Sequence, residues 1–155
     1  MRQSRIEILQ RMPIFGAVRE DMLKLVLDLS QIIFVTQGGL FFREGDRADS
    51  MFVLEAGKVE VVKGERGKEY LIRNLGEGDC FGEMGLIDLF PRSASVRAIE
   101  NCTAIEISTA TLHKIYEQDV EQFAIIEMNI GRELSRRLRQ SEAVPNALPA
   151  RDDTR

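Results

Sequence analysis

Residues 81–96 read FGEMGLIDLFPRSASV, and this stretch decides how the rest of the chain is interpreted. The spacing of Gly82 and Gly85 lets the backbone come close to a ligand and point successive N–H groups at an anion. A short apolar turn over residues 86–90 can present its N-terminal end to the same charge. The sequence therefore predicts a phosphate-binding cassette.

Two charged residues of the stretch specify the ligand further. Arg92 is its only guanidinium, and a planar fork suits a phosphate that carries two free oxygens. Ser93 adds a hydroxyl beside it. A carboxylate at Glu83 would repel a bare phosphate, so it indicates a hydroxyl donor on the ligand, such as a ribose 2′-hydroxyl. The alternatives are a surface arginine at position 92 and a helix-capping carboxylate at position 83.

The stretch resembles the cyclic nucleotide-binding domain of bacterial catabolite activator-type regulators, of regulatory subunits of cyclic AMP-dependent kinase, and of cyclic nucleotide-gated channels. The family pattern is Phe-Gly-Glu-apolar-Ala/Gly-Leu, a short gap, and Arg-Ala/Ser-Ala-Ser/Thr-Val, and this chain keeps every position. The resemblance implies an eight-stranded roll with the cassette inserted between two strands. It also implies a ligand-binding set within the cassette: Gly82, Glu83, Met84, Gly85, Arg92 and Ser93.

The purine side of the site is implied by position only. Val61 and Ile72 match places where relatives pack apolar groups on the base, although ordinary core packing explains both residues equally well. Arg73 stands where relatives often carry a small polar group near the base edge. Its guanidinium either prefers a guanine carbonyl or is simply solvated.

A third set of candidates lies near the C-terminal end of the long helix. Arg136, Arg137 and Ser141 align with the region from which bacterial relatives contact adenine, and we take Arg137 and Ser141 as ligand-binding candidates. Four extra residues precede this point, so a basic solvated face near a helix C-terminus is the alternative.

Length and composition limit the function classes. A chain of 155 residues with 44% hydrophobic content suits one domain with a sizeable core. The net charge of -4 argues against a nucleic-acid-binding surface. Without an apolar run of membrane-spanning length or a signal peptide, we expect a soluble cytoplasmic protein. In that compartment Cys80 and Cys102 are expected to be reduced core residues.

Short apolar runs separated by glycine-rich turns predict a mainly β fold with flanking helices, an eight-stranded β jelly roll or double-stranded β-helix. We expect the cyclic nucleotide-binding domain over 1–143, with the roll at about 31–108, C-terminal helices over 109–143 and a disordered tail over 144–155. Two short helices are expected in the first thirty residues. Seven strands are predicted from the pattern, at 32–35, 40–43, 50–55, 58–63, 69–75, 95–98 and 102–107.

The expected long helix over 119–142 carries an apolar stripe at three- and four-residue spacing, made of Phe123, Ile126, Ile130, Leu134 and Leu138. Part of this stripe must pack on the roll. Because the helix is longer than one small roll needs, we expect a homodimer through it; the alternative is a helix that only closes the domain. Gly131 weakens the helix midway by about 1 kcal/mol relative to alanine.

These features predict a sensor for a cyclic nucleotide, cyclic AMP or cyclic GMP, with Ser93 and Ser141 favouring cyclic AMP. A helix-turn-helix would follow in a transcription regulator, and none does here, so we expect no DNA partner and an unidentified downstream protein. With a single histidine, His113, the chain is not expected to be a metal-dependent enzyme. The alternative function is a nucleotide-independent dimerisation or docking scaffold of the same fold.

Overall fold

The structure is a computed structural model of the chain, and its description covers residues 2–86 and 90–143. The centre of the cassette, residues 87–89, and the tail that we expected to be disordered, residues 144–155, lie outside the described residues.

Two antiparallel four-stranded sheets form the roll, as the sequence predicts. The first sheet has the order β1-β8-β3-β6 and the second the order β2-β7-β4-β5. The strands are β1 (Gln31–Val35), β2 (Leu40–Phe42), β3 (Ser50–Ala56), β4 (Val59–Glu65), β5 (Lys68–Leu75), β6 (Cys80–Phe81), β7 (Ser95–Ala98) and β8 (Cys102–Ser108).

The sequence pattern misses β6, which has only two residues, because so short a strand shows no alternation of polar and apolar positions. This strand pairs with β3 and leads directly into the cassette. The short turn that we expected over 86–90 falls mostly on residues 87–89, outside the described residues. Before it, a 3-10 helix, η2, spans Glu83–Leu86. The cassette helix therefore starts at Glu83 itself.

The two central strands of the first sheet, β3 and β8, contribute side chains to the core on both faces. On β3, Met51 and Val53 belong to the core under the helices, whereas Phe52 and Leu54 point between the two sheets. Strand β8 alternates in the same way. Because both faces are covered, β3 is apolar at consecutive positions and carries the cassette strand on a rigid support.

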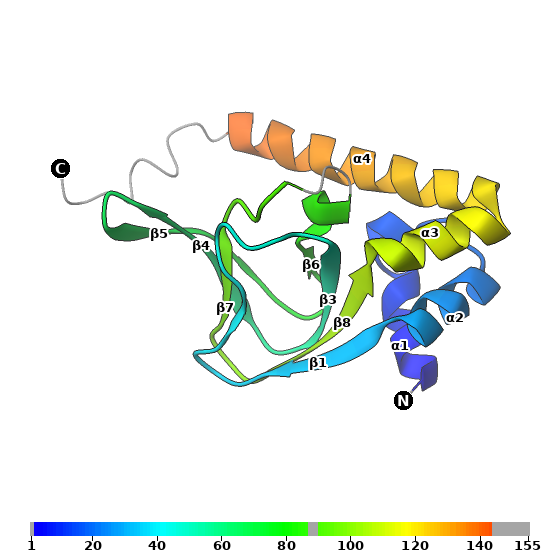
Figure 1. Cartoon of the computed structure of the whole chain (residues 1–155), viewed down its shortest axis with the longest axis horizontal. Coiled ribbons are helices and arrows are strands. Elements are labelled where there is room, and N and C mark those ends of the chain that lie inside the picture. The colour runs from blue at the N-terminus through cyan, green and yellow to red at the C-terminus, as the bar shows by residue number, and fades with distance from the viewer. Residues whose placement is uncertain (1, 87–89, 144–155) are drawn as a thin grey trace.

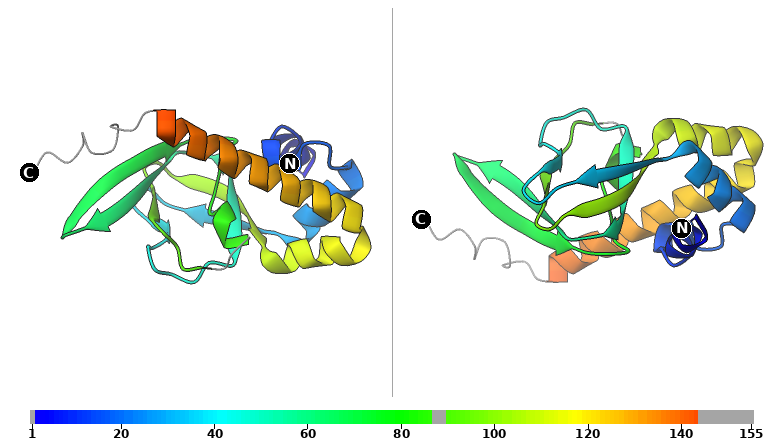
Figure 2. Two further views of the ribbon diagram at one scale, coloured as in Figure 1. Left: turned by 90° about the horizontal axis from the view of Figure 1, so that it is seen from above. Right: turned by 90° about the horizontal axis from the view of Figure 1, so that it is seen from below.

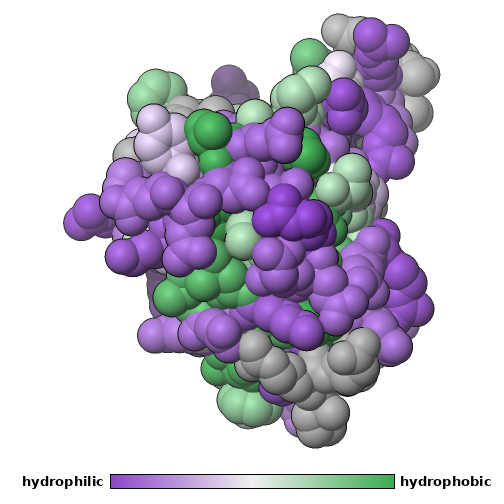
Figure 3. All heavy atoms as spheres, turned by 90° about the vertical axis from the view of Figure 1, so that its right-hand side faces the viewer, coloured by the Kyte–Doolittle hydropathy of each residue, from purple (hydrophilic) through white to green (hydrophobic). Residues whose placement is uncertain are grey.

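Helices gather at one end of the roll, and their exposed sides are mainly hydrophilic with smaller apolar patches between them (Figure 1, Figure 3). The longest helix leaves this end and runs along the roll above η2 toward the β4–β5 hairpin (Figure 1, Figure 2). The helices are α1 (Arg2–Gln10), the 3-10 helix η1 (Pro13–Phe15), α2 (Glu20–Leu29), α3 (Thr109–Gln118) and α4 (Val120–Ala143).

Buried polar side chains anchor α4 to the N-terminal segment. The Asn129 amide donates hydrogen bonds to the carbonyls of Ile14 at 3.2 Å and Gly16 at 2.8 Å. The Gln122 side-chain oxygen accepts from the backbone N–H of Arg19 at 2.9 Å. These bonds fix the first half of α4 on the N-terminal segment. The direction of the helix, and thus the position of its far half over the cassette, follows from this.

The apolar stripe of the long helix divides between two environments. Ile126 and Ile130 are fully buried, and Phe123 and Leu134 pack beside them. Leu138 is 62% exposed and does not share this packing. Among helices in the described ranges, none is long and apolar enough to span a membrane. Cys80 and Cys102 are buried and free.

Replacing Asn129 by alanine removes both carbonyl bonds of the anchor. We expect the free energy of unfolding to fall by about 1–3 kcal/mol, because a buried polar group left without its partner loses this much. Urea denaturation of Asn129→Ala measures the loss, and Gln140→Ala, an exposed change on the same helix, should cost less than about 0.5 kcal/mol. Equal losses in the two variants would contradict the anchor.

Candidate functional site

The cassette begins with a backbone conformation that requires glycine. Gly82 lies between β6 and η2 with φ of +80°, a region that residues with a Cβ rarely adopt. A Cβ here would also lie 2.8 Å from a terminal guanidinium nitrogen of Arg92. Gly82 therefore both turns the chain and lets the arginine approach the backbone.

The Arg92 side chain is 7% exposed and is held by neutral groups. Its terminal nitrogens donate to the carbonyls of Gly82 at 3.1 Å and Ser50 at 2.8 Å. Its guanidinium carbon lies 4.0 Å from the centre of the Phe42 ring, a cation–π contact. Phe42 in turn belongs to an aromatic cluster with Phe52 and Phe81. The core of the roll thus fixes the guanidinium.

One donor of this guanidinium has no acceptor. Among the described residues, Arg92 Nε is the single buried side-chain nitrogen or oxygen without a hydrogen-bond partner. Burial lowers the pKa of Arg92, and the carboxylates of Asp49, Glu106, Asp46 and Glu83 only partly oppose it. Arginine nevertheless remains charged in proteins. A buried cation with a free N–H is a ready site for an anion.

The backbone of Arg92 is held as firmly as its side chain. Its carbonyl accepts from Gly45 and its N–H donates to the Asp46 carbonyl, both at 2.8 Å. Lys63, on β4, donates to the next carbonyl, that of Ser93, at 2.9 Å. The turn before β3 and the second sheet thus fix this side of the cassette.

Glu83 pairs with the long helix. Its carboxylate is 3% exposed and accepts a hydrogen bond from Arg137 of α4. Arg137 also donates to the Cys80 carbonyl at 3.3 Å and lies 3.4 Å from a Glu133 oxygen. Burial by itself would lower the pKa of Arg137, but the Glu83 and Glu133 carboxylates and the contact with Cys80 outweigh it, and the pKa is raised. The ion pair connects the cassette directly to α4.

Burial also raises the pKa of the Cys80 thiol to about 12, and the nearby Glu83 charge acts in the same direction. At neutral pH the thiol is therefore protonated and does not compete with Glu83 for Arg137. Within the described residues, no group of three or more His, Cys, Asp or Glu could hold a metal ion.

This geometry combines a buried cation with a free donor and a buried carboxylate, both on one cassette. Residues 32–119 match the family described as cyclic nucleotide-binding domain, which is more than half of the chain. The chain belongs to the cyclic nucleotide-binding domain family. The jelly roll with its flanking helices is the fold of its structural neighbours in this family.

Relatives of the domain include bacterial regulators. The chain is 29% identical over 131 residues to the cyclic AMP receptor protein of Thermus thermophilus, with 84% of this chain and 59% of the relative covered. It is 30% identical over 136 residues to a CRP-like cAMP-activated global transcriptional regulator of Mycobacterium tuberculosis, covering 87% and 59%. The chain thus spans about three-fifths of the length of these relatives.

The fold is shared with solved domains as well. A cyclic nucleotide-binding domain from Methylobacillus flagellatus superposes with a TM-score of 0.82 at 23% identity, over 96% of this chain and 83% of that one. At this identity the likeness concerns the fold alone.

Three further predicted residues of the cassette are Met84, Gly85 and Ser93. Met84 and Gly85 are part of η2, and the Met84 side chain is 52% exposed. Ser93 is exposed, and its carbonyl rather than its hydroxyl accepts the hydrogen bond from Lys63. The prediction that these residues bind ligand through backbone groups and a hydroxyl stays a prediction.

The candidates for the base lie on the β4–β5 hairpin. Val61 pairs with Arg73, and the next pair is Val62 with Leu71, so Ile72 is the extra residue of a β-bulge. Val61 and Ile72 are half-buried, whereas Arg73 is exposed. A bulge changes the direction of nearby side chains. The structure records no hydrogen bond or ring contact between these three residues and the cassette arginine, so their role also stays a prediction.

On α4, the structure shows that Arg136 and Arg137, which are adjacent in the sequence, have different partners. Arg137 reaches Glu83, whereas Arg136 is exposed and pairs with Glu133 on the same helix. Ser141 lies in the last turn of α4, but its side chain is outside the described residues. Sequence reasoning missed Ser50, Phe42 and Lys63, because they come from strands distant in the chain.

Removing one partner of the Glu83–Arg137 pair should be costly. In Arg137→Met the buried Glu83 carboxylate loses its cation, and we expect the free energy of unfolding to fall by about 3–5 kcal/mol. Adding Glu83→Gln should restore part of the loss, because the unpaired charge is then gone. Chemical denaturation measures both effects.

Arg136→Met is the matched control for this pair, since it breaks an exposed ion pair one residue away. Its expected cost is at most about 1 kcal/mol. A cost for Arg137→Met no larger than that of the control would show that the pair does not hold α4 on the cassette.

Proposed function

We propose that this domain is a sensor that binds cyclic AMP in the cassette and passes the signal through α4. The observation that carries the proposal is the buried Arg92 guanidinium, whose Nε has no partner. A cyclic phosphate oxygen accepts from this N–H and supplies the negative charge that the neutral cradle lacks. The domain acts in binding, in the cytoplasm, rather than as an enzyme.

Glu83 gives the ribose its place in this proposal. Its buried carboxylate accepts the 2′-hydroxyl, which explains why an acid stands beside a phosphate site. The same carboxylate pairs with Arg137 of α4. Nucleotide binding therefore changes the acceptor that α4 depends on, and the difference in affinity between the two arrangements of α4 shifts their populations.

The choice of cyclic AMP rests on two serines and on the relatives. Ser93 matches the bacterial regulators in the cassette, Ser141 aligns with the region from which they contact adenine, and two bacterial relatives carry cyclic AMP in their names. A human relative, 35% identical over 95 residues, is cGMP-dependent protein kinase 2. Since both nucleotides share the ribose phosphate, cyclic GMP is the necessary comparison, and Arg73 is the residue whose guanidinium would favour a guanine carbonyl.

Titration calorimetry tests the phosphate site. We expect cyclic AMP to bind with micromolar or better affinity and more tightly than cyclic GMP. Arg92→Ala should weaken binding by about one to four decades, because a buried phosphate facing no cation costs about 2–5 kcal/mol. Arg97→Ala is the control, since Arg97 is close in sequence but pairs with Glu60 and Glu69.

Arg92→Lys keeps the positive charge but removes the planar N–H donors of the guanidinium. It therefore distinguishes the loss of a phosphate contact from unfolding of the domain. Circular dichroism of each variant establishes that it is folded. Unchanged affinity in folded Arg92→Ala would contradict the site. No binding of either nucleotide to nucleotide-free wild-type protein would favour the alternative, a scaffold of the same fold.

The proposal includes a homodimer through α4. The helix exposes a stripe of apolar or small residues within about 80° of the helix circumference, at 100° per residue. We call it the open face of α4: Val120, Ala124, Met128, Gly131, Ser135 and Leu138. It lies away from the side that buries Ile126 and Ile130. Exposed apolar side chains at this spacing fit a second copy of the same helix.

Sedimentation velocity tests the dimer. Wild-type protein should sediment as a dimer, and Met128→Glu should be largely monomeric, because it places a charge in the middle of the open face. Gln140→Glu makes the same change of charge at an exposed position outside the face and should leave the dimer intact. A monomeric wild-type protein, or equal effects of both variants, would contradict this interface. The downstream partner is expected to be a protein whose binding to this domain depends on the nucleotide.

A further inference from the structure

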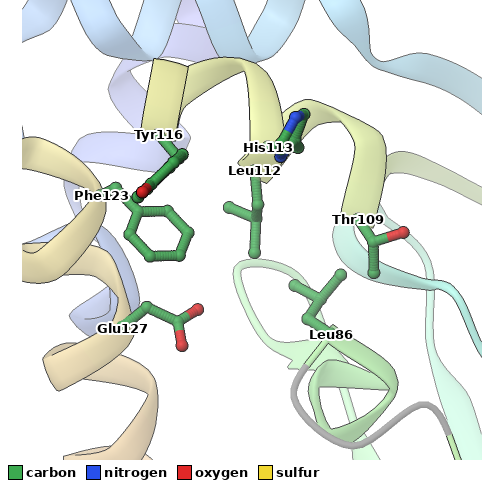
Figure 4. A pocket seen from close by; sticks show the side chains of 7 residues that line it. All are labelled: Leu86, Thr109, Leu112, His113, Tyr116, Phe123 and Glu127. Atoms are coloured by element: carbon green, nitrogen blue, oxygen red, sulfur yellow. The ribbon is translucent and has the colours of Figure 1, made fainter. Parts of the chain in front are cut away.

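A cavity lies where the cassette helix meets α3 and α4, and Arg92 is not among its lining residues. Its volume is about 230 Å³, and it is lined by Leu86 of η2, by Thr109, Leu112, His113 and Tyr116 of α3, and by Phe123 and Glu127 of α4 (Figure 4). None of these residues takes part in the proposed nucleotide contacts. The cavity therefore needs an explanation of its own.

The cavity combines aromatic walls with one acidic group. Tyr116 and Phe123 form an edge-to-face pair with ring centres 5.3 Å apart. Leu86 and Leu112, both largely buried, supply aliphatic surface opposite them. Glu127 extends its carboxylate from α4 into the space below the Phe123 ring (Figure 4). No lysine or arginine lines the cavity among the described residues.

The Glu127 carboxylate has no counter-charge. It has neither a hydrogen bond nor an ion pair with any described residue, and partial burial alone raises its pKa. The Nε2 atom of His113, which also lines the cavity, lies 3.3 Å from the exposed Glu117 carboxylate. A half-buried carboxylate beside apolar walls is destabilised until a cation joins it.

We infer that this cavity binds a small organic cation that joins a single ring or short alkyl body to an ammonium group. The ammonium pairs with the Glu127 carboxylate and lies against the faces of Phe123 and Tyr116, since aromatic rings attract cations. The apolar body contacts Leu86 and Leu112. The size fits, because a cavity of about 150 Å³ holds one benzene molecule and this one is somewhat larger.

The cavity is open to solvent on one side, and its walls come from three elements, the cassette helix, α3 and α4. Two of these elements also carry the Glu83–Arg137 pair, since Glu83 lies in the cassette helix and Arg137 in α4. A bound cation therefore touches the cassette and the long helix together. The inference does not depend on nucleotide binding, and its test is made without nucleotide.

The probe is 2-phenylethylammonium, and 2-phenylethanol is its uncharged counterpart of nearly the same shape. Proton NMR of the tyrosine rings reports on the cavity, because Tyr116 lies in its wall and Tyr70, on β5, does not. A Tyr70→Phe variant assigns the Tyr116 signals. We expect the ammonium compound to shift Tyr116 with a dissociation constant of about 1 mM or lower, as suits a ligand of this size.

Charge dependence decides the test. Glu127→Gln should weaken the binding of the ammonium compound by about ten- to a hundredfold, the value of a charge-assisted contact. The affinity for the alcohol should stay unchanged. Glu121→Gln, an exposed change in the first turn of α4, should have no effect. Equal binding of ammonium and alcohol, an equal effect of both variants, or no shift of Tyr116 up to about 10 mM would each overturn the inference.

Discussion

The buried guanidinium of Arg92 is the constraint on which the site depends. A cation taken out of water without an acid partner in direct contact is unfavourable, and two carbonyls, the Ser50 hydroxyl and the face of Phe42 offset this in part. Those groups come from β2, from β3 and from the turn into η2. The roll must therefore close correctly for the guanidinium to be held, and the glycine at position 82 must be kept for it to fit.

A second charge extends this arrangement to the long helix. Glu83 is buried next to the arginine cradle and pairs with Arg137, so one carboxylate belongs to the cassette and to α4 at once. The anchor at Asn129 fixes the near half of α4 to the N-terminal segment. The far half carries the ion pair with the cassette. In the proposed mechanism, a ligand that alters Glu83 therefore acts first on this half of the helix.

The cassette and its two charged residues could be predicted from the sequence, because the glycine spacing and the pair Glu83 and Arg92 lie within sixteen consecutive residues. Strand runs and the start of α3 are likewise local signals. The cradle was not predictable: Ser50 lies 42 residues from Arg92, and its carbonyl carries no sequence signature. Part of the helix stripe was expected to pack on the roll, and this part is Ile126 and Ile130, which are buried, whereas Leu138 is exposed. Periodicity alone does not say where the packed part ends.

The proposed function depends on the free N–H of Arg92 donating to a cyclic phosphate. A crystal structure of the protein with cyclic AMP tests this dependence. We expect a phosphate oxygen within hydrogen-bond distance of Arg92 Nε and the ribose 2′-hydroxyl on the Glu83 carboxylate. A nucleotide bound elsewhere, with Arg92 still held only by Gly82 and Ser50, would contradict it.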